Sequence, residues 1–303
     1  MIVRTVHRSV TLIKAPMELG AGRQGVSLGP EAILQAGLLR QLNLLPIDVN
    51  REITVPMLKT FGEPPNPKLK NLRDVLRFNT KLASAVYRTA KAGAFPLVLG
   101  GDHSIAIGTV AGLADHYRNL GIIWFDAHAD LNTVETSPSG NIHGMPLAVC
   151  LGIGERSLVA INGFAPKIKP EHIVIIGARQ LDEGEKELIR KLGIACYTMH
   201  DIDRLGMARI MEEALQIVEG RTDGLHISFD VDCLDPSVAP GTGTPVPGGL
   251  SYREAHLALE LLHESGLVRS AEFVEVNPAF DVDNRTARTA VELIGSLMGK
   301  TIL

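Results

Sequence analysis

The chain has 303 residues, of which 45% are hydrophobic and 21% are charged, and it carries a net charge of -4 at pH 7. This composition, without any low-complexity tract, is typical of a compact globular protein and argues against a disordered chain. The lack of a basic balance also argues against nucleic acid as a partner.

The first residues and the cysteines indicate where such a chain would fold. The stretch "MIVRTVHRSVTLIKAP" lacks the apolar core of a signal peptide, and no segment approaches the roughly 20 apolar residues of a membrane span. Cys150, Cys196 and Cys233 are odd in number and form no CxxC pair, which favours a compartment that keeps thiols reduced. We therefore expect a cytoplasmic protein with no membrane partner.

Apolar, strand-like runs alternate with helix-like segments along the sequence. The first strand is predicted at residues 9–16, and the loop after it leads into a helix over 30–42, with Pro30 in its first turn. The Pro-rich stretch "FGEPPNPK" precedes a long amphipathic helix over 69–91. Further strands are predicted at 95–104, 121–126, 172–179, 194–199, 224–236 and 270–278, and further helices at 183–191, 208–218 and 252–263.

Repeated alternation of this kind predicts parallel strands joined by helical crossovers, and hence an α/β fold. The sequence contains no internal repeat and no Pro/Gly/Ser linker long enough to separate domains. We expect residues 1–303 to form a single domain.

The predicted strand at 121–126 ends in a polar cluster, because "GIIWF" is followed by Asp126, His128 and Asp130. Ligands of open α/β sheets bind beyond the carboxyl ends of the strands, which is where these residues lie. If strand geometry continues through them, their period of two directs all three side chains to one side. Such a group is unfavourable unless a cation lies within it, so a divalent metal ion is the simplest candidate. An acidic, solvated loop is the alternative.

Other predicted strands end in the same way, and if they are neighbours in one sheet their polar side chains converge. The converging donors would be His103, Asp126, His128, Asp130, Asp230 and Asp232. Six such donors exceed what one ion needs, which indicates two ions bridged by carboxylates. Oxygen-rich donors with two imidazoles and no thiolate favour manganese and leave iron, cobalt, nickel and zinc open.

Six motifs, in order, resemble those of the arginase family of ureohydrolases: "GGDHS", "DAHADLN", "SGNIHG", "SFDVDCLDP", "GTGTP" and "EFVEVNP". The resemblance runs nearly from end to end. It implies a three-layer α/β/α sandwich around a mostly parallel central sheet. It also implies hydrolysis of a guanidino group to urea by a hydroxide that bridges two manganese ions, and assembly into a homo-oligomer, a trimer or a hexamer.

The resemblance assigns roles to particular positions. His103, Asp126, Asp130 and Asp230 would hold one ion, and Asp126, His128, Asp230 and Asp232 the other, so that Asp126 and Asp230 bridge. Asp130 would also orient the hydroxide, and Glu275 would hold the guanidinium group. His143 resembles the family's proton shuttle, a task suited to imidazole near neutral pH.

The resemblance also bears on the substrate. Asn132, Ser139 and Asn141 match positions that bind the carboxylate of arginine, and Asp182 and Glu185 match positions near its α-amine. Thr244, in "GTGTP", is expected to line the pocket. We therefore expect L-arginine as the substrate and L-ornithine and urea as the products.

One residue points to a different substrate. Cys233 stands where arginases more often have glycine and resembles what many agmatinases show. Because it lies beside two metal ligands, we expect Cys233 to tune the site without selecting the substrate. An agmatinase, another guanidino-acid hydrolase of the family or a zinc deacetylase of the same fold is one alternative, and a non-catalytic binding or regulatory protein that retains the fold is the other. Asp102, Asp235, Glu272 and Trp124 are expected to be structural.

Overall fold

The computed structural model describes residues 8–57 and 66–301, so part of the predicted Pro-rich loop lies outside the described residues. Its centre is one eight-stranded sheet in which every paired strand is parallel. In spatial order the strands are β2 (Ile47–Thr54), β1 (Arg8–Ala15), β3 (Phe95–Gly100), β8 (Val268–Val274), β7 (Gly224–Asp230), β4 (Leu120–Phe125), β5 (Ile173–Ala178) and β6 (Ala195–Thr198). The predicted parallel α/β fold is confirmed.

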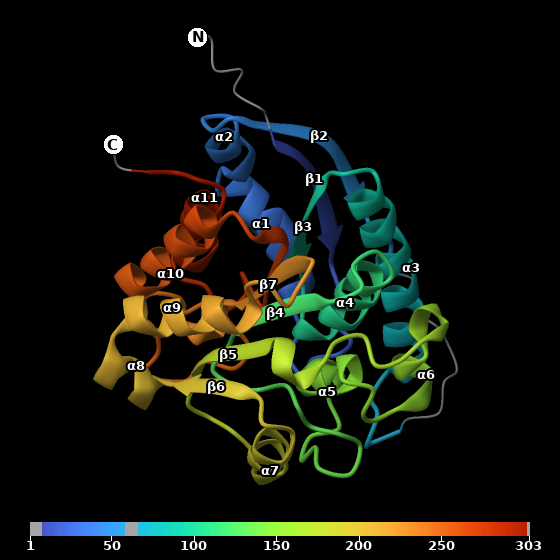
Figure 1. The fold of residues 1–303 in the computed structure, drawn as a ribbon. Helices are drawn as coiled ribbons and strands as arrows, with labels where there is room; N and C mark the ends of the chain where they lie inside the picture. The colour runs from blue at the N-terminus through green and yellow to red at the C-terminus, as the bar shows by residue number, and fades with distance from the viewer. Residues whose placement is uncertain (1–7, 58–65, 302–303) are drawn as a thin grey trace.

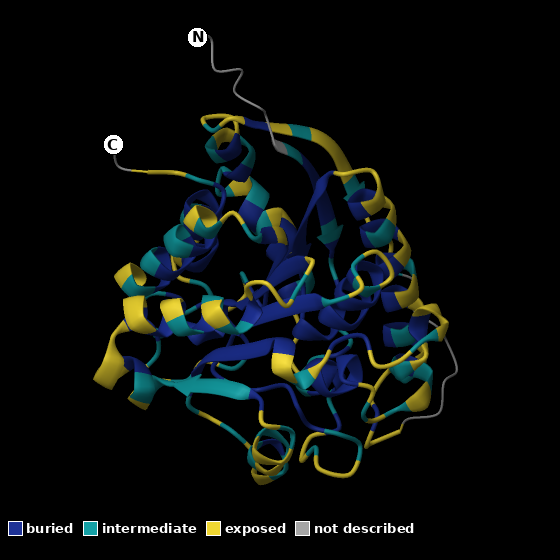
Figure 2. Ribbon diagram, viewed as in Figure 1, coloured by how far each residue is buried: buried dark blue, intermediate teal, exposed yellow. Residues whose placement is uncertain are grey.

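Strands β3, β4 and β5 are apolar because both faces of the sheet are covered, whereas β7 and β8 also bury polar residues such as Ser228 and Glu272. In β4, Ile122 and Trp124 belong to one hydrophobic core, whereas Ile123 and Phe125 belong to the core on the opposite face. The middle of the sheet is buried, as the dark blue strands in Figure 2 show. Burial on two faces removes the alternation of polar and apolar residues and leaves continuous hydrophobic runs.

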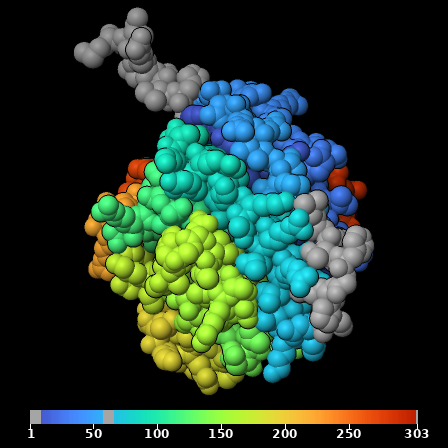
Figure 3. Space-filling model, turned by 90° about the vertical axis from the view of Figure 1, so that its right-hand side faces the viewer, coloured from blue at the N-terminus to red at the C-terminus, as the bar shows by residue number. Residues whose placement is uncertain are grey.

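Two layers of helices enclose the sheet, which confirms the three-layer sandwich (Figure 1). One layer consists of α1 (Gly29–Gln35), α2 (Leu38–Leu42), α8 (Met199–Leu205), α9 (Met207–Val218), α10 (Tyr252–Ser265) and α11 (Arg285–Leu297). The other consists of α3 (Leu72–Lys91), α4 (Ala106–Ala114), α5 (Pro146–Cys150), α6 (Arg156–Val159) and α7 (Glu183–Leu192). Figure 3 shows α3, in cyan, beside the yellow-green region of α5 and α6 on this second face.

The structure differs from the predicted secondary structure at two places. The edge strand β2 was not predicted, because it is largely polar and exposed and pairs only with β1. The predicted helix over 30–42 is two helices, α1 and α2, because Gly37 between them has a φ of 106°. A left-handed residue interrupts the helical hydrogen-bond pattern, and glycine adopts that conformation without steric cost. Within the described ranges, no helix is both long and apolar enough to cross a membrane.

Candidate active site

Four adjacent strands, β3, β8, β7 and β4, bring the predicted donors to one edge of the sheet. His103 and Glu275 lie just beyond β3 and β8, and Asp126 lies just beyond β4. Asp230 ends β7, and Asp232 lies in the short 3-10 helix Val231–Cys233 that follows it. The predicted strands are therefore neighbours, and their carboxyl ends form one site.

The segment 126–130 reaches this site differently from the expectation. Strand β4 ends at Phe125 and does not continue through the segment, and Asp130 has a φ of 52°. The bend is held by the His128 N–H, which donates to Asp126 Oδ1 at 2.7 Å, and by the Asp130 carbonyl, which accepts the Leu147 N–H at 3.0 Å. The three side chains thus converge through a strained bend, and the predicted strand alternation was wrong.

The six predicted donors, here called the strand-end cluster, form two groups that meet at Asp126. In the first group His103 Nδ1 lies 3.2 Å from Asp126 Oδ2, 3.1 Å from Asp130 Oδ2 and 3.2 Å from Asp230 Oδ2. In the second group His128 Nδ1 lies 3.2 Å from Asp126 Oδ1 and 3.2 Å from Asp232 Oδ2. Asp126 therefore places one carboxylate oxygen in each group. Asp230 enters the first group through Oδ2, while its Oδ1 accepts the Asp232 N–H at 2.8 Å.

These groups fit divalent cations. Among the described residues, His103 Nδ1 and Asp130 Oδ2 are buried and have no hydrogen-bond partner, which is costly unless an ion satisfies them. Two ligand atoms about 2.1 Å from one ion and at right angles around it are about 3.0 Å apart, close to the spacing found here. Burial and the neighbouring carboxylates raise the pKa of Asp230 and of Asp232, and a cation would relieve that repulsion.

Buried contacts behind the donors fix their orientation. Trp124 donates from Nε1 to Asp126 Oδ2 at 2.9 Å, and its ring stacks on His103 with the centroids 4.2 Å apart. His103 Nε2 lies 2.8 Å from Ser228 Oγ, which donates to Glu272 Oε1 at 2.7 Å. Sequence reasoning placed Trp124 and Glu272 as structural but missed Ser228. The sequence feature that could have indicated Ser228 is its position as a polar residue inside a buried strand, two residues before Asp230. Such outer contacts orient metal ligands.

Glu275 and His143 meet beside the cluster. Glu275 has a φ of 63°, and its Oε1 accepts the His103 N–H at 2.9 Å and lies 3.1 Å from His143 Nδ1. Burial disfavours the imidazolium form of His143, but the Glu275 contact and nearby carboxylates outweigh it and raise the pKa of His143 to about 9. The backbone N–H of His143 donates to the Gly20 carbonyl, and the backbone N–H of Gly20 donates to the Asp102 carboxylate. Asp102 therefore holds the loop that supports His143, in line with the expected structural role.

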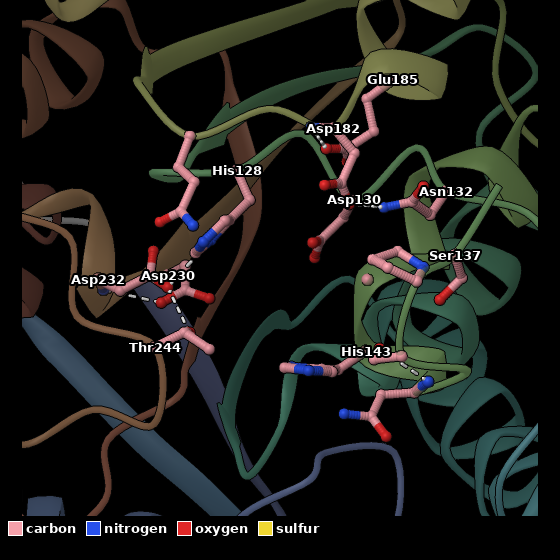
Figure 4. Close-up of a pocket in the computed structure, with 15 residues that line it drawn as sticks. His128, Asp130, Asn132, Ser137, His143, Asp182, Glu185, Asp230, Asp232 and Thr244 are labelled. Carbon is pink, nitrogen blue, oxygen red and sulfur yellow. Dashed lines mark hydrogen bonds and ion pairs between the residues drawn. The ribbon is translucent and has the colours of Figure 1, made fainter. Parts of the chain in front are cut away.

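A cavity of about 350 Å³ opens over the cluster (Figure 4). In Figure 4, His128, Asp230 and Asp232 lie together, while Asn132 and Asp182 lie apart from them. The predicted residues that line it are His128, Asp130, Asn132, Ser139, Asn141, His143, Asp182, Glu185, Asp230, Asp232 and Thr244. Ser137 and Gln180 also line it and were not predicted.

The other predicted site residues lie close by. His103 and Asp126 are buried beneath the cavity floor. Glu275 lines an adjoining cavity of about 280 Å³, which shares Asn141, His143 and Thr244 with the first. All the predicted site residues are therefore brought together, although Glu275 faces a separate compartment.

Asn132, Asp182 and Glu185 form a connected polar edge. Asn132 Nδ2 donates to Asp182 Oδ2 at 2.8 Å, and its Oδ1 accepts from Thr136 Oγ1 at 2.9 Å. Glu185 is only 3% exposed, and its two oxygens accept the N–H groups of Leu131 and Asp182 at 3.1 and 2.8 Å. Burial raises the pKa of Glu185 to about 7. Asp182 is thus the N-cap residue of α7 and is exposed at the pocket, whereas the buried Glu185 closes the capping box by accepting the Asp182 N–H.

A parallel α/β/α sandwich whose strand ends gather these His and Asp donors is typical of metal-dependent α/β enzymes in which divalent ions activate water. The comparison with known proteins is more specific. A family model described as "Arginase family" matches residues 8–299. The chain belongs to the arginase family and is a hydrolase of that family.

Several relatives match this chain over almost its whole length. The arginase of Bacillus caldovelox is 55% identical over 98% of this chain and 100% of its own, and the arginase of Bacillus subtilis is 56% identical with the same coverage. The crystal structure of the Bacillus caldovelox arginase superposes with a TM-score of 0.95, covering 98% of this chain and 100% of that one. An Entamoeba histolytica arginase in complex with L-ornithine is 33% identical, with a TM-score of 0.89 and coverage of 97% and 99%.

Proposed function

We propose that this protein hydrolyses the guanidino group of L-arginine, with two bound manganese ions, to give L-ornithine and urea. One observation carries the proposal: a cavity that joins two groups of metal-binding side chains to a separate set of amide, hydroxyl and carboxylate groups. The first groups suit hydrolysis, and the second set suits recognition of an amino acid head. The relation to an arginase known with L-ornithine supports the same assignment.

The strand-end cluster would hold the ions. We assign His103, Asp126, Asp130 and Asp230 to one ion, and Asp126, His128, Asp230 and Asp232 to the other. The position of Asp126 between the two groups supports its role as a bridge. When bound, two such cations lower the pKa of a shared water enough to supply the nucleophile near neutral pH.

The chain's own groups would position the substrate and move the proton. Glu275 lines the adjoining cavity, where its Oε2 lies 3.8 Å from the position a Cβ would take on Gly243, so this carboxylate would hold the guanidinium group. Asp130 would accept a hydrogen bond from the attacking water. His143, whose Nδ1 lies 3.1 Å from Glu275 Oε1, would donate a proton to the leaving amine.

The head of the substrate would meet the far edge of the cavity. Asn132, Ser139 and Asn141 offer amide and hydroxyl donors to the carboxylate, and Asp182 offers a carboxylate to the α-ammonium. Because both oxygens of Glu185 already accept backbone N–H groups, we assign it mainly to holding Asp182 in place. Thr244, which donates to Asp232 at 2.9 Å, would define the side of the pocket nearest the ions.

We further propose that the chain acts as a single catalytic domain in a homo-oligomer, a trimer or a hexamer, in the cytoplasm. The three cysteines are free thiols, which supports a reducing compartment. Light scattering of the purified protein would give the oligomeric state.

The proposed reaction is tested by a panel of three guanidino compounds: L-arginine, agmatine and 4-guanidinobutyrate. Manganese-loaded protein should release urea fastest from L-arginine, and metal analysis should find two ions per chain. A preference for agmatine would instead support the agmatinase alternative, which Cys233, buried beside two of the donors, favours. Urea release that survives chelation would overturn the metal assignment.

A further inference from the structure

Residues 66–71, which precede α3, lie against the loop that carries Ser139, Gly140 and Asn141. The Lys70 N–H donates to the Gly140 carbonyl at 3.0 Å. Gly140 has a φ of 71°, and a Cβ there would lie 1.9 Å from the Pro67 carbonyl oxygen, so only glycine fits. The two segments are thus in backbone contact although they lie about 70 positions apart in the chain.

The side chain of Lys70 continues this contact to Asn141, which lines the pocket. Its Nζ donates to Asn141 Oδ1 at 3.0 Å. Because an ammonium group can only donate, the contact fixes the orientation of the Asn141 amide and leaves Nδ2 as the group that donates to a ligand. That Nδ2 lies 2.8 Å from the position a Cβ would take on Gly22, at the junction of the two cavities that Asn141 lines.

The same contact places a positive charge beside Asn141, which lines both cavities. A carboxylate bound to Asn141 Nδ2 would lie one amide group away from the Lys70 ammonium, at a distance where opposite charges still attract at an exposed site. Agmatine has no carboxylate and carries two positive charges, so the same ammonium repels it. The charge of Lys70 therefore acts in opposite directions on the two substrates.

We propose that Lys70 is a positioning residue that makes the pocket selective for guanidino compounds with an α-carboxylate. It holds the Asn141 amide in the donating orientation and adds attraction for the carboxylate. The inference rests on the proposed hydrolysis of L-arginine, which it deepens.

The test compares Lys70→Met, Lys70→Arg and, as a matched control, Lys68→Met, which removes the same charge from a neighbouring exposed position. In Lys70→Met, KM for L-arginine should rise about 2- to 5-fold with kcat nearly unchanged, as expected for an exposed charge. The kcat/KM for agmatine should stay constant or rise. Lys70→Arg should recover most of the arginine affinity, and Lys68→Met should leave the arginine-to-agmatine ratio unchanged.

Binding of the two reaction products, L-ornithine from L-arginine and 1,4-diaminobutane from agmatine, gives a readout that is independent of turnover. The Kd of L-ornithine, measured by calorimetry, should rise in Lys70→Met by the same factor as KM, whereas binding of 1,4-diaminobutane should not weaken. An equal loss of activity on both substrates would overturn the inference and mean that Lys70 only supports the structure. An equal effect of Lys68→Met would also overturn it and mean that the general surface charge is responsible. If the wild-type protein itself prefers agmatine, the proposed function fails. If it prefers L-arginine but Lys70→Met behaves as wild type, only this inference fails.

Discussion

The strand-end cluster and the edge of the pocket are built from different parts of the fold. Donors of the cluster follow directly from buried parallel strands, and His103, Asp126 and Asp232 are each only 1% exposed. The residues proposed to bind the substrate head, here called the pocket rim, are Asn132, Ser139, Asn141 and Asp182. They lie in loops, and Ser139 and Asp182 are exposed.

This difference suggests a division of labour. The cluster is fixed by the sheet and by buried partners such as Trp124 and Ser228, so its geometry can serve chemistry that tolerates little movement. The rim is held by contacts between loops, such as Lys70 with Asn141, and can change without disturbing the sheet. Substitutions in the cluster should therefore act on metal content and kcat, and those in the rim on KM and selectivity.

The largest effect is expected for Asp230→Asn, which changes a carboxylate of the first group that we propose to bind both ions. Loss of its negative charge should lower bound manganese and reduce kcat/KM by at least about 10⁴, beyond the 10- to 100-fold that loss of an outer contact costs. Asp235→Asn is the matched control, because Asp235 accepts hydrogen bonds from Ser237, Gly248 and Gly249 outside the cluster. Metal analysis and urea release check both, and equal manganese content and activity in the two variants would refute the assignment.

A large effect without metal loss is expected for His143→Asn. His143 contacts Glu275 but belongs to neither group of metal-binding side chains, so both ions should remain while kcat falls by about 10² to 10⁴. Added imidazole should restore part of the activity. Loss of manganese in this variant would mean that His143 is a metal ligand and belongs to the strand-end cluster.

The cluster was largely predictable from sequence, whereas its supporting contacts were not. A buried strand such as β4 is visible as an apolar run, and polar residues that follow such runs must share one edge of a parallel sheet. The left-handed backbone of Asp130 and Glu275 left no local signal, because it is imposed by the surrounding packing. The edge strand β2 was missed because its exposed, polar residues lack the hydrophobic pattern of a buried strand.

The residues of the pocket rim were predicted from family motifs, but the contacts that hold them were not. Nothing local in the sequence indicates that Lys70 meets Asn141 or that Glu185 accepts the Leu131 N–H, since both contacts join segments far apart in the chain. Periodicity reports the burial of a segment but not its loop partners. Such contacts become visible only once the sheet order has placed the loops side by side.

A selectivity effect is expected for Asn141→Ala in the rim. The wild-type protein should favour L-arginine over agmatine by at least about 10² in kcat/KM, because agmatine leaves the carboxylate donors unpaired. Removing the Asn141 amide should shrink this ratio by about tenfold, chiefly through a higher KM for L-arginine. Agmatine measured on the same variant is the internal control. A variant that loses manganese, or that loses both substrates equally, would show that the rim and the cluster are not separable here.

The smallest effect concerns Glu185, which joins the two regions because its carboxylate accepts N–H groups from Leu131, next to a donor of the cluster, and from Asp182 of the rim. Its pKa of about 7 in the folded protein lies above the 4.5 of an ordinary glutamate side chain. A raised carboxyl pKa means that folding favours the protonated form. This contribution to stability is present below about pH 4.5 and is lost as the pH rises through about 7.

The free energy of unfolding of the wild-type protein relative to Glu185→Gln should therefore fall by about 1 to 3 kcal/mol between pH 5 and pH 8. Glutamine has only one side-chain oxygen and loses one of the two hydrogen bonds that Glu185 accepts. This loss is the same at both pH values, so it cancels when the two stability differences are compared. Glu183→Gln, an exposed change in the same turn of α7, should show no such trend. Urea unfolding of the three proteins at both pH values measures the effect. If the wild-type advantage instead grew with pH, the charged carboxylate would be the favoured form, and the backbone donors would outweigh its burial.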